Sequence, residues 1–405
     1  MDSISLHDTR SPAPGAPTLG ARHPAGAFTP TESERHVLAV LAQEEGLTRA
    51  ELAERADLPR STVGAAVRRL LGARLVEEHE HASSTGGRRP TLLRRTRSDG
   101  AVLVGELGAN HARLGLASLS GELLATSKLD LEIDEGQDAI VERLRGAWEA
   151  LEEASPSPVL AVGLGVPGPV DEEGRVTGAA RMPGWNGLDL VGTLRDATGH
   201  PAVIENDARA SAIGEWSRRG EHHDSCMYIK AGTGIGAGWI SGGVAHRGAH
   251  GFAGDLTHTR IKTEHPRPCS CGNAGCLETV ASGAAILRQL AEAGRTFDGT
   301  EDIIATANNG DPQVTALVRD AGARIGEVLS GLVNFLNPKR IVIGGSMSQM
   351  GALLAGLRTE LYDRCLPMCT ERLSIETSLA GADAPLIGMA ILARQSLHQQ
   401  PRSTS

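Results

Sequence analysis

The sequence predicts an α/β chain in two parts, a small helical N-terminal module followed by a larger domain of two lobes. From residue 31 apolar residues recur with helical spacing in three short segments. Beyond residue 98, apolar runs with strand character alternate with helical segments, as is typical of α/β domains with a cleft between lobes. We assign a tail to 1–28, the helical module to 29–98 and the two-lobed domain to 99–400.

The composition describes a globular chain with reduced thiols. Six cysteines in 405 residues are too few for a disulfide scaffold. No apolar run approaches the length of about 20 residues that spans a membrane. The tail is rich in Pro, Ala, Gly and Ser and lacks the apolar core of a signal peptide. We therefore expect a disordered tail and a cytoplasmic protein without a membrane anchor.

The N-terminal module has the order of elements found in a winged helix-turn-helix. Thr31 or Ser33 can cap a first helix, and Thr48 with Glu51 forms a capping-box pair for a second. A turn at 57–59 precedes a third helix, RSTVGAAVRRLLGARL, and a strand then leads to the basic tip STGGRRP at 84–90. Helix, helix, turn, helix and β-wing are the parts of this DNA-binding module.

Charge within the module favours contact with double-stranded DNA. Residues 58–97 hold nine arginines against three glutamates, although the whole chain has a net charge of −9. We expect base or phosphate contacts from the start of the third helix, phosphate contacts further along it, and minor-groove or phosphate contacts from the tip. The candidates are, in that order, Arg60, Ser61 and Thr62; Arg68 and Arg69; and Arg88 and Arg89. The alternatives are a protein–protein module with surface arginines or a solvated linker.

The larger domain begins with a buried strand at 101–108 and a meander that turns at Gly121. A helix at 136–154, a strand ending in a Pro-Gly turn, and a strand–helix pair joined at Asn206-Asp207 follow. The segment 227–243 predicts a hairpin with a glycine-rich tip. We expect the remaining helices at 280–294, 301–309, 312–335 and 383–398, with a further strand at 340–348.

One segment, 258–278, carries the ligand set of a structural zinc site. Cys269, Cys271 and Cys276 supply three thiolates, and His258 supplies an imidazole. A loop rich in Gly and Pro cannot fix its shape by regular hydrogen bonds, so a cross-linking metal makes physical sense. The alternative is three buried structural thiols beside an unrelated histidine.

Seven motifs resemble the ROK family of repressors, open reading frames and kinases. They are GLGVPGPVD, MPGWNG, ENDARASAIGEW, AGTGIGAG, GFAGDLTH, CSCGNAGCLETVAS and IVIGGSMS. The resemblance implies an actin-like, sugar-kinase fold preceded by the winged helix of the repressor branch. It also implies that sugar is bound by Asn206, Asp207, Asp255, His258 and Glu278, with Asp207 at the position of the kinase base and His258 also binding zinc.

The sequence departs from the family pattern in two places. Asp255 stands where the family has Glu, and Thr257 replaces a glycine, so a plain glucose specificity is in doubt. The first phosphate loop of the kinases reads Asp-x-Gly-Gly-Thr, in which the acid helps to hold magnesium, whereas residues 106–110 read ELGAN. Half of a phosphate cradle should not support phosphoryl transfer.

We therefore expect a DNA-binding transcriptional regulator, a repressor that senses a sugar or sugar derivative and has no enzymatic activity. Its partners would be an operator duplex and a second copy or copies of the chain, as a homodimer or homotetramer. One alternative is an ATP-dependent sugar kinase with an appended DNA-binding domain. Another is a ligand-free dimerisation scaffold.

Overall fold

The computed structural model describes residues 31–43, 46–72, 76–81, 91–95, 100–155, 157–178, 182–219 and 225–399. The predicted tail at 1–28 and the tip at 84–90, with Arg88 and Arg89, lie outside the described residues. Within the described residues, no helix is both long and apolar enough to span a membrane.

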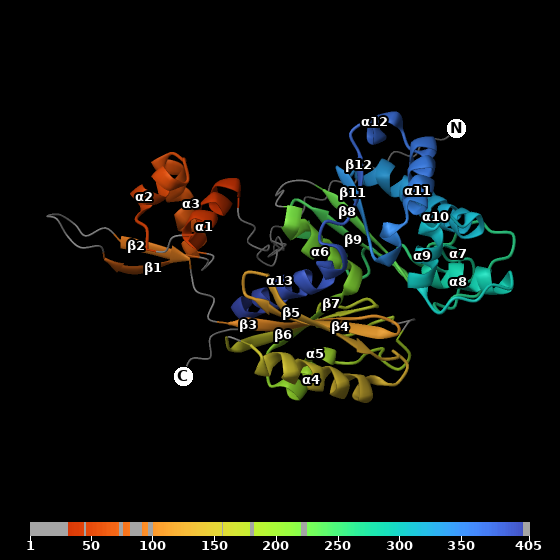
Figure 1. Ribbon diagram of the computed structural model, residues 1–405, viewed down its shortest axis with the longest axis horizontal. Coiled ribbons are helices and arrows are strands. Elements are labelled where there is room, and N and C mark those ends of the chain that lie inside the picture. Colours follow the sequence, from red (N-terminus) through yellow and green to blue (C-terminus); the bar gives the residue numbers. More distant parts are fainter. Residues whose placement is uncertain are drawn as a thin grey trace, which may run out of the picture.

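The N-terminal module folds as the sequence predicts, with three helices followed by an antiparallel strand pair (Figure 1). The predicted capping box forms, with Thr48 and Glu51 exchanging backbone-to-side-chain hydrogen bonds of 2.7 and 3.3 Å. Of the two candidate caps of the first helix, Thr31 forms a second such pair, with Glu34, at 2.7 and 3.4 Å. A shared core that includes Val37, Leu52, Val67 and Leu93 holds the elements together. The elements are α1 (Glu32–Gln43), α2 (Arg49–Arg55), α3 (Arg60–Gly72), β1 (Val76–His81) and β2 (Thr91–Arg95).

The first lobe is built on a five-stranded sheet of order β5-β4-β3-β6-β7. β3, β6 and β7 run parallel, and β4 and β5 extend the sheet antiparallel. Helices α4 and α5 lie together on one side of this sheet (Figure 1). The elements are β3 (Ala101–Leu107), β4 (His111–Ser118), β5 (Leu123–Asp130), α4 (Gln137–Glu153), β6 (Val159–Val166), α5 (Leu190–Thr198) and β7 (Ala202–Asn206).

The second lobe repeats the same strand pattern in the order β10-β9-β8-β11-β12. β8, β11 and β12 run parallel, and β9 and β10 are antiparallel. The predicted glycine-rich hairpin is the β8–β9 pair. The elements are β8 (Cys226–Ala231), β9 (Ile235–Ser241), β10 (Val244–Ala245), α7 (Glu278–Ala281), α8 (Gly283–Glu292), α9 (Thr300–Asn308), α10 (Pro312–Leu336), β11 (Arg340–Gly344), η1 (Ser346–Gln349), α11 (Gly351–Arg364), α12 (Pro367–Thr370) and β12 (Ser374–Thr377).

Two crossing helices, α6 (Asp207–Arg219) and α13 (Ala384–Gln399), connect the lobes. α6 leaves the first lobe and packs against β8 and β9 of the second, whereas α13 leaves the second lobe and packs against β3 and β6 of the first. Glycines allow their close approach: a Cβ at Gly214 would lie 1.9 Å from the Ala384 carbonyl oxygen, and one at Gly388 would lie 1.9 Å from that of Ala210. Any larger residue at either position would force the helices apart.

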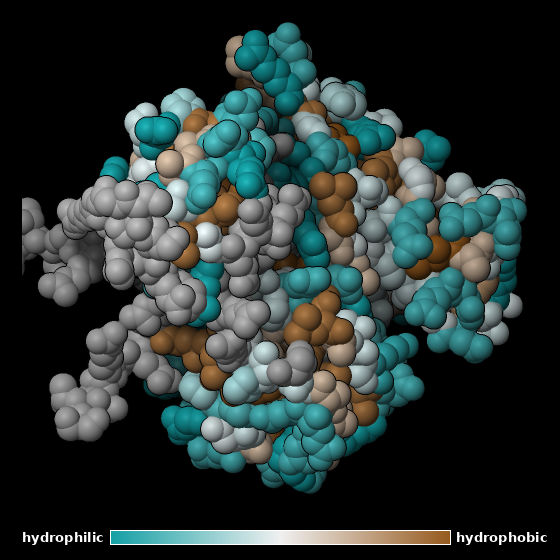
Figure 2. Space-filling view, turned by 60° about the vertical axis from the view of Figure 1, so that its left-hand side comes forward, coloured by the Kyte–Doolittle hydropathy of each residue, from teal (hydrophilic) through white to brown (hydrophobic). Residues whose placement is uncertain are grey.

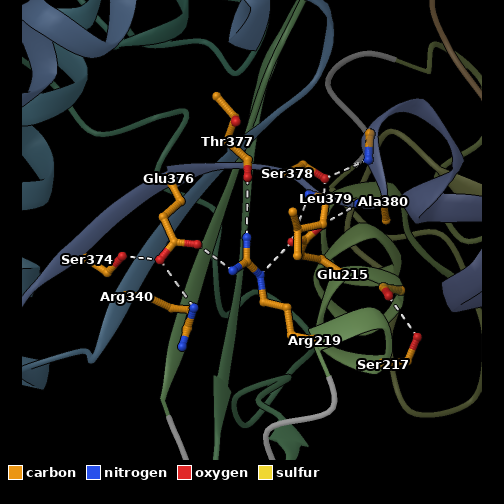
Figure 3. Close-up of polar contacts among 12 residues, drawn as sticks. Glu215, Ser217, Arg219, Arg340, Ser374, Glu376, Thr377, Ser378, Leu379 and Ala380 are labelled. Atoms are coloured by element: carbon orange, nitrogen blue, oxygen red, sulfur yellow. Dashed lines mark hydrogen bonds and ion pairs between the residues drawn. The ribbon is translucent and has the colours of Figure 1, made fainter.

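A buried group of charges joins the end of α6 to the chain that leads into α13. We call Glu215, Arg219, Arg340 and Glu376 the hinge cluster. Figure 3 shows Arg219 between the two carboxylates, with Nε 2.6 Å from Glu215 and Nη1 2.5 Å from Glu376. The Glu215 carboxylate also accepts hydrogen bonds from the Ser378 hydroxyl and from the backbone N–H groups of 379 and 380.

The surface in Figure 2 is mixed, with hydrophobic residues in separate patches among hydrophilic ones. In the part of the chain that the structure describes, the large apolar residues with the greatest exposed fractions lie in α10, α12 and the segment after β12, namely Phe335, Met368 and Leu379. Single exposed apolar residues of this kind are common on globular proteins.

Candidate functional site: a cleft between the lobes

A cleft of about 1420 Å³ lies between the two lobes, lined by residues of both sheets. All five side chains predicted to contact sugar line it: Asn206, Asp207, Asp255, His258 and Glu278. They come from the end of β7, the start of α6, the loop after β10 and the start of α7. The fold therefore brings together residues that are as many as 72 positions apart in the sequence.

Local hydrogen bonds fix how two of these side chains, Asn206 and Glu278, are presented. Asn206 accepts from the Arg209 N–H at 3.0 Å and donates to the Gly168 carbonyl at 3.2 Å. Glu278 accepts from the N–H of Ile235, the first residue of the second strand of the glycine-rich hairpin, at 3.0 Å. Asp255 is exposed. Carboxylate and amide groups held in this way can each accept from or donate to a polyhydroxylated ligand.

Lys230 was not anticipated from the sequence, and it lies beside the predicted base. Its Nζ is 2.6 Å from Asp207 Oδ2 and also contacts Glu106 Oε1. We call Glu106, Asp207 and Lys230 the cleft cluster. Burial by itself lowers the pKa of Lys230, but the two carboxylates outweigh burial and hold the pKa well above its usual value. The ammonium therefore stays charged at neutral pH.

Both glycine-containing loops of the cleft close on a backbone hydrogen bond, and in the hairpin the Gly232 N–H donates to the Gly234 carbonyl at 2.9 Å. In the first loop the Gly108 N–H donates to the His111 carbonyl at 2.7 Å, which closes a tight turn. In the hairpin, Gly236 and Gly238 are needed for packing, because a Cβ at either position would lie 2.8 or 2.6 Å from a methyl group of α6. Part of the glycine pattern thus serves the contact between β9 and α6.

The four predicted metal ligands converge. His258 Nδ1 lies 3.4 Å from Cys269 Sγ, Cys271 Sγ lies 3.6 Å from Cys276 Sγ, and all four donor atoms fall within 4.8 Å of one another. Three thiolates and one imidazole are a donor set that tetrahedral zinc takes, and the two short separations are close to its donor–donor edges of about 3.5 to 3.8 Å. Burial raises the pKa of the Cys276 thiol to about 12, so a thiolate there requires a nearby cation. The group can hold a metal.

The residues predicted to contact DNA occupy the surface of α3. Arg60, Ser61 and Arg68 are exposed, and Thr62 is half-buried at the start of the helix. Arg69 lies 3.2 Å from Glu34, whose side chain is only 2% exposed. Arg69 therefore has a structural partner within the module, which sequence spacing did not indicate.

Comparison with known proteins agrees with both parts of the fold. The sequence profile of the ROK family matches residues 103–396, and that of the MarR family matches residues 28–89. A protein named putative xylose repressor, from Caldicellulosiruptor sp. (strain Rt8B.4), is 31% identical over 370 residues, which cover 87% of this chain and 92% of that protein.

Two solved structures extend the comparison. A ROK family transcriptional regulator described as a homolog of the E. coli MLC protein is 29% identical, with a TM-score of 0.68 over 90% of this chain and 96% of its own. A ROK family glucokinase from Streptomyces griseus, solved with glucose and AMPPNP, is also 29% identical, with a TM-score of 0.66. It matches all of its own length but only 73% of this chain.

Proposed function

The chain belongs to the ROK family, and we propose that it is a DNA-binding transcriptional repressor whose ROK domain senses a sugar or sugar derivative. The observation that carries this proposal is the joint presence of a MarR-type winged helix and a ROK domain in one chain. The similarity to a putative xylose repressor and to a ROK regulator extends through both parts, whereas the glucokinase matches the ROK domain alone.

The sugar site that we propose is formed by Asn206, Asp207, Asp255, His258 and Glu278. Their convergence on one cleft supports this assignment, because a ring of acceptors with one amide suits the hydroxyls of a pentose or hexose. Zinc held by His258 and the three cysteines would keep one wall of the site in shape. His258 belongs to both the metal group and the cleft lining.

The first loop supports a regulator without kinase activity. Glu106 stands at the position of the magnesium-binding acid, its carboxylate contacts Lys230, and the Gly108 N–H is used within the turn. Phosphoryl transfer depends on a positioned metal nucleotide. An assay of ADP release with pentoses, hexoses and their N-acetyl derivatives tests the kinase alternative, and turnover that Asp207→Asn abolishes would support it.

DNA binding is assigned to the start of α3 and to the basic tip. In this role Arg60, Ser61 and Thr62 approach base edges or phosphates, and Arg68 and Arg69 approach phosphates. Arg88 and Arg89, which lie outside the described residues, would contact the minor groove or phosphates. A homodimer or homotetramer would place two winged helices on a palindromic site. Ligand-induced movement of the lobes would then change their spacing.

The test uses duplexes selected from a random pool by the full-length protein. Their binding is followed by fluorescence anisotropy with and without D-xylose, D-glucose and N-acetylglucosamine. We expect one class of sugar to change the affinity for DNA at least tenfold, and Arg60→Ala to weaken selected DNA more than random DNA. A protein that selects no duplex, or whose DNA binding no sugar alters, would contradict the proposal.

The zinc assignment has its own measurement. Metal content by mass spectrometry should show about one zinc per chain in the wild type and a loss in Cys269→Ser, together with a weaker response to the sugar. A zinc-free variant whose sugar response is unchanged would show that the metal does not support the site.

A further inference from the structure

Lys230 is the one lysine in β8, a strand whose other residues are buried. About a quarter of its side chain is exposed, and its partners Asp207 and Glu106 are 12% and 10% exposed. A charge in such a position is costly unless it is paired. Its two partners come from different parts of the fold: Glu106 lies on β3 of the first lobe, and Asp207 begins the crossing helix α6.

The geometry around the ammonium is that of a cation site. Two carboxylate oxygens from separate elements approach one point, with the Asp207 oxygen at 2.6 Å from Nζ. Oxygen ligands surround hard divalent cations at about 2.0 to 2.6 Å, and carboxylates suit magnesium, manganese and calcium. Without Lys230 the two carboxylates would face each other unpaired, an arrangement that attracts such an ion.

We propose that Lys230 is the specificity-determining residue of the cleft: its ammonium occupies the position of a divalent cation between Asp207 and Glu106, so the cleft accepts a sugar and refuses a magnesium–nucleotide complex. The inference rests on the proposed sugar-sensing role, since it explains how the cleft binds a sugar without binding a nucleotide beside it. A fixed ammonium needs no metal to balance the carboxylates, and it leaves no carboxylate pair for a metal that would bring a nucleotide.

Asp207 remains able to recognise a sugar. Its Oδ1 accepts from the Ala208 N–H at 2.8 Å and from the Asn206 amide at 3.3 Å, whereas its Oδ2 accepts from Lys230 and has a second lone pair. A ligand hydroxyl can therefore donate to Asp207 while the ion pair persists. The same contact joins the lobes, because Lys230 lies on the second lobe and Glu106 on the first.

The test measures Mn²⁺ binding to the full-length protein by electron paramagnetic resonance. Lys230→Met removes the charge at similar volume and should bind Mn²⁺ at least tenfold more tightly than the wild type. Lys128→Met is the matched control: Lys128 also lines the cleft, but its side chain is 59% exposed and lies 3.9 Å from the exposed Asp130. Lys128→Met and Lys230→Arg, which keeps the charge, should behave like the wild type.

Three results would overturn the proposal. One is a folded Lys230→Met protein, judged by circular dichroism, that gains no Mn²⁺ affinity. Another is wild-type protein that already binds Mn²⁺ tightly at a site lost in Asp207→Asn, a measurement that needs no change at Lys230. Metal-free AMPPNP binding that Lys230→Met abolishes would likewise overturn it, since Lys230 would then be a phosphate ligand. The Mn²⁺ readout involves neither sugar nor DNA, so its failure is distinct from failure of the proposed function.

Discussion

The hinge cluster and the cleft cluster both join separate parts of the ROK domain through charged side chains, but their charges are balanced differently. The hinge cluster pairs two arginines with two glutamates, and backbone N–H groups complete the bonding of Glu215 (Figure 3). The cleft cluster sets one lysine against two acids and lies on the cleft wall. None of the hinge-cluster residues lines the cleft, and balanced charge away from a ligand site indicates a structural role, whereas excess charge on a cleft wall indicates recognition.

The largest effect should come from the hinge cluster. Glu215→Ala leaves the nearly buried Arg219 without one partner and removes the acceptor for residues 378–380, so we expect a loss of about 3 to 5 kcal/mol in the free energy of unfolding. Urea unfolding of the ROK domain measures it. Ser217→Ala, on the same helix, removes only a hydroxyl bonded to the Gly214 carbonyl and should cost less than about 1 kcal/mol. Equal losses of stability in the two variants would show that Glu215 contributes no more than an ordinary hydroxyl, and the hinge cluster would then have no special structural role.

A smaller effect, of a different kind, is expected in the cleft cluster. Asp207→Asn leaves Lys230 paired with Glu106 and keeps an oxygen that can accept from its ammonium, so the free energy of unfolding should fall by about 1 to 2 kcal/mol, less than in Glu215→Ala. Affinity for the sugar should fall about 10- to 100-fold, because hydrogen bonds to a charged group contribute about 1.5 to 3 kcal/mol. Calorimetry measures this, with Asp298→Asn, elsewhere on the cleft wall, as the control. A large loss of stability with unchanged affinity for the sugar would show that Asp207 has a structural role and does not bind the sugar.

The smallest effect is a pH dependence that belongs to the hinge cluster. Burial alone raises the pKa of Glu376, but hydrogen bonds from Ser374 and Arg219 outweigh burial and lower it below its ordinary value of 4.5. A lowered pKa gives stability that is present above pH 4.5 and is lost as pH falls through the folded-state pKa. The stability difference between wild type and Glu376→Gln should therefore shrink below pH 4.5 in thermal melts. A difference that stays constant down to pH 3 would contradict this pairing.

Local sequence signals predicted the elements but not the ion clusters. The cap at Thr31, the capping box at Thr48, the turn before α3 and the cysteine group all involve residues close in sequence, where propensity and spacing are informative. Lys230 contacts Glu106 from 124 positions away, and Glu215 contacts Ser378 from 163 positions away. The available signal was a lysine inside the buried run MYIKA, which requires an acid that only the tertiary fold identifies.

The five residues predicted to contact sugar were identified by the family resemblance and not by their spacing in the sequence. Sequence periodicity predicted the strand before Asn206-Asp207 and the helix after them. It could not show that the loop holding Asp255 lines the same cleft. The prediction for Arg69 was incomplete for a similar reason, because its partner Glu34 lies on another helix.

The glycine contacts between α6 and α13 limit how the lobes can move. At Gly214 and Gly388 each backbone occupies the space where the other helix would carry a side chain. Sliding either helix along the other would bring larger residues into that contact, so translation is blocked while rotation about it stays open. The helix contact then acts as a fixed pivot between the lobes. A ligand that closes the cleft on one side of this pivot would move the lobes apart on the other side.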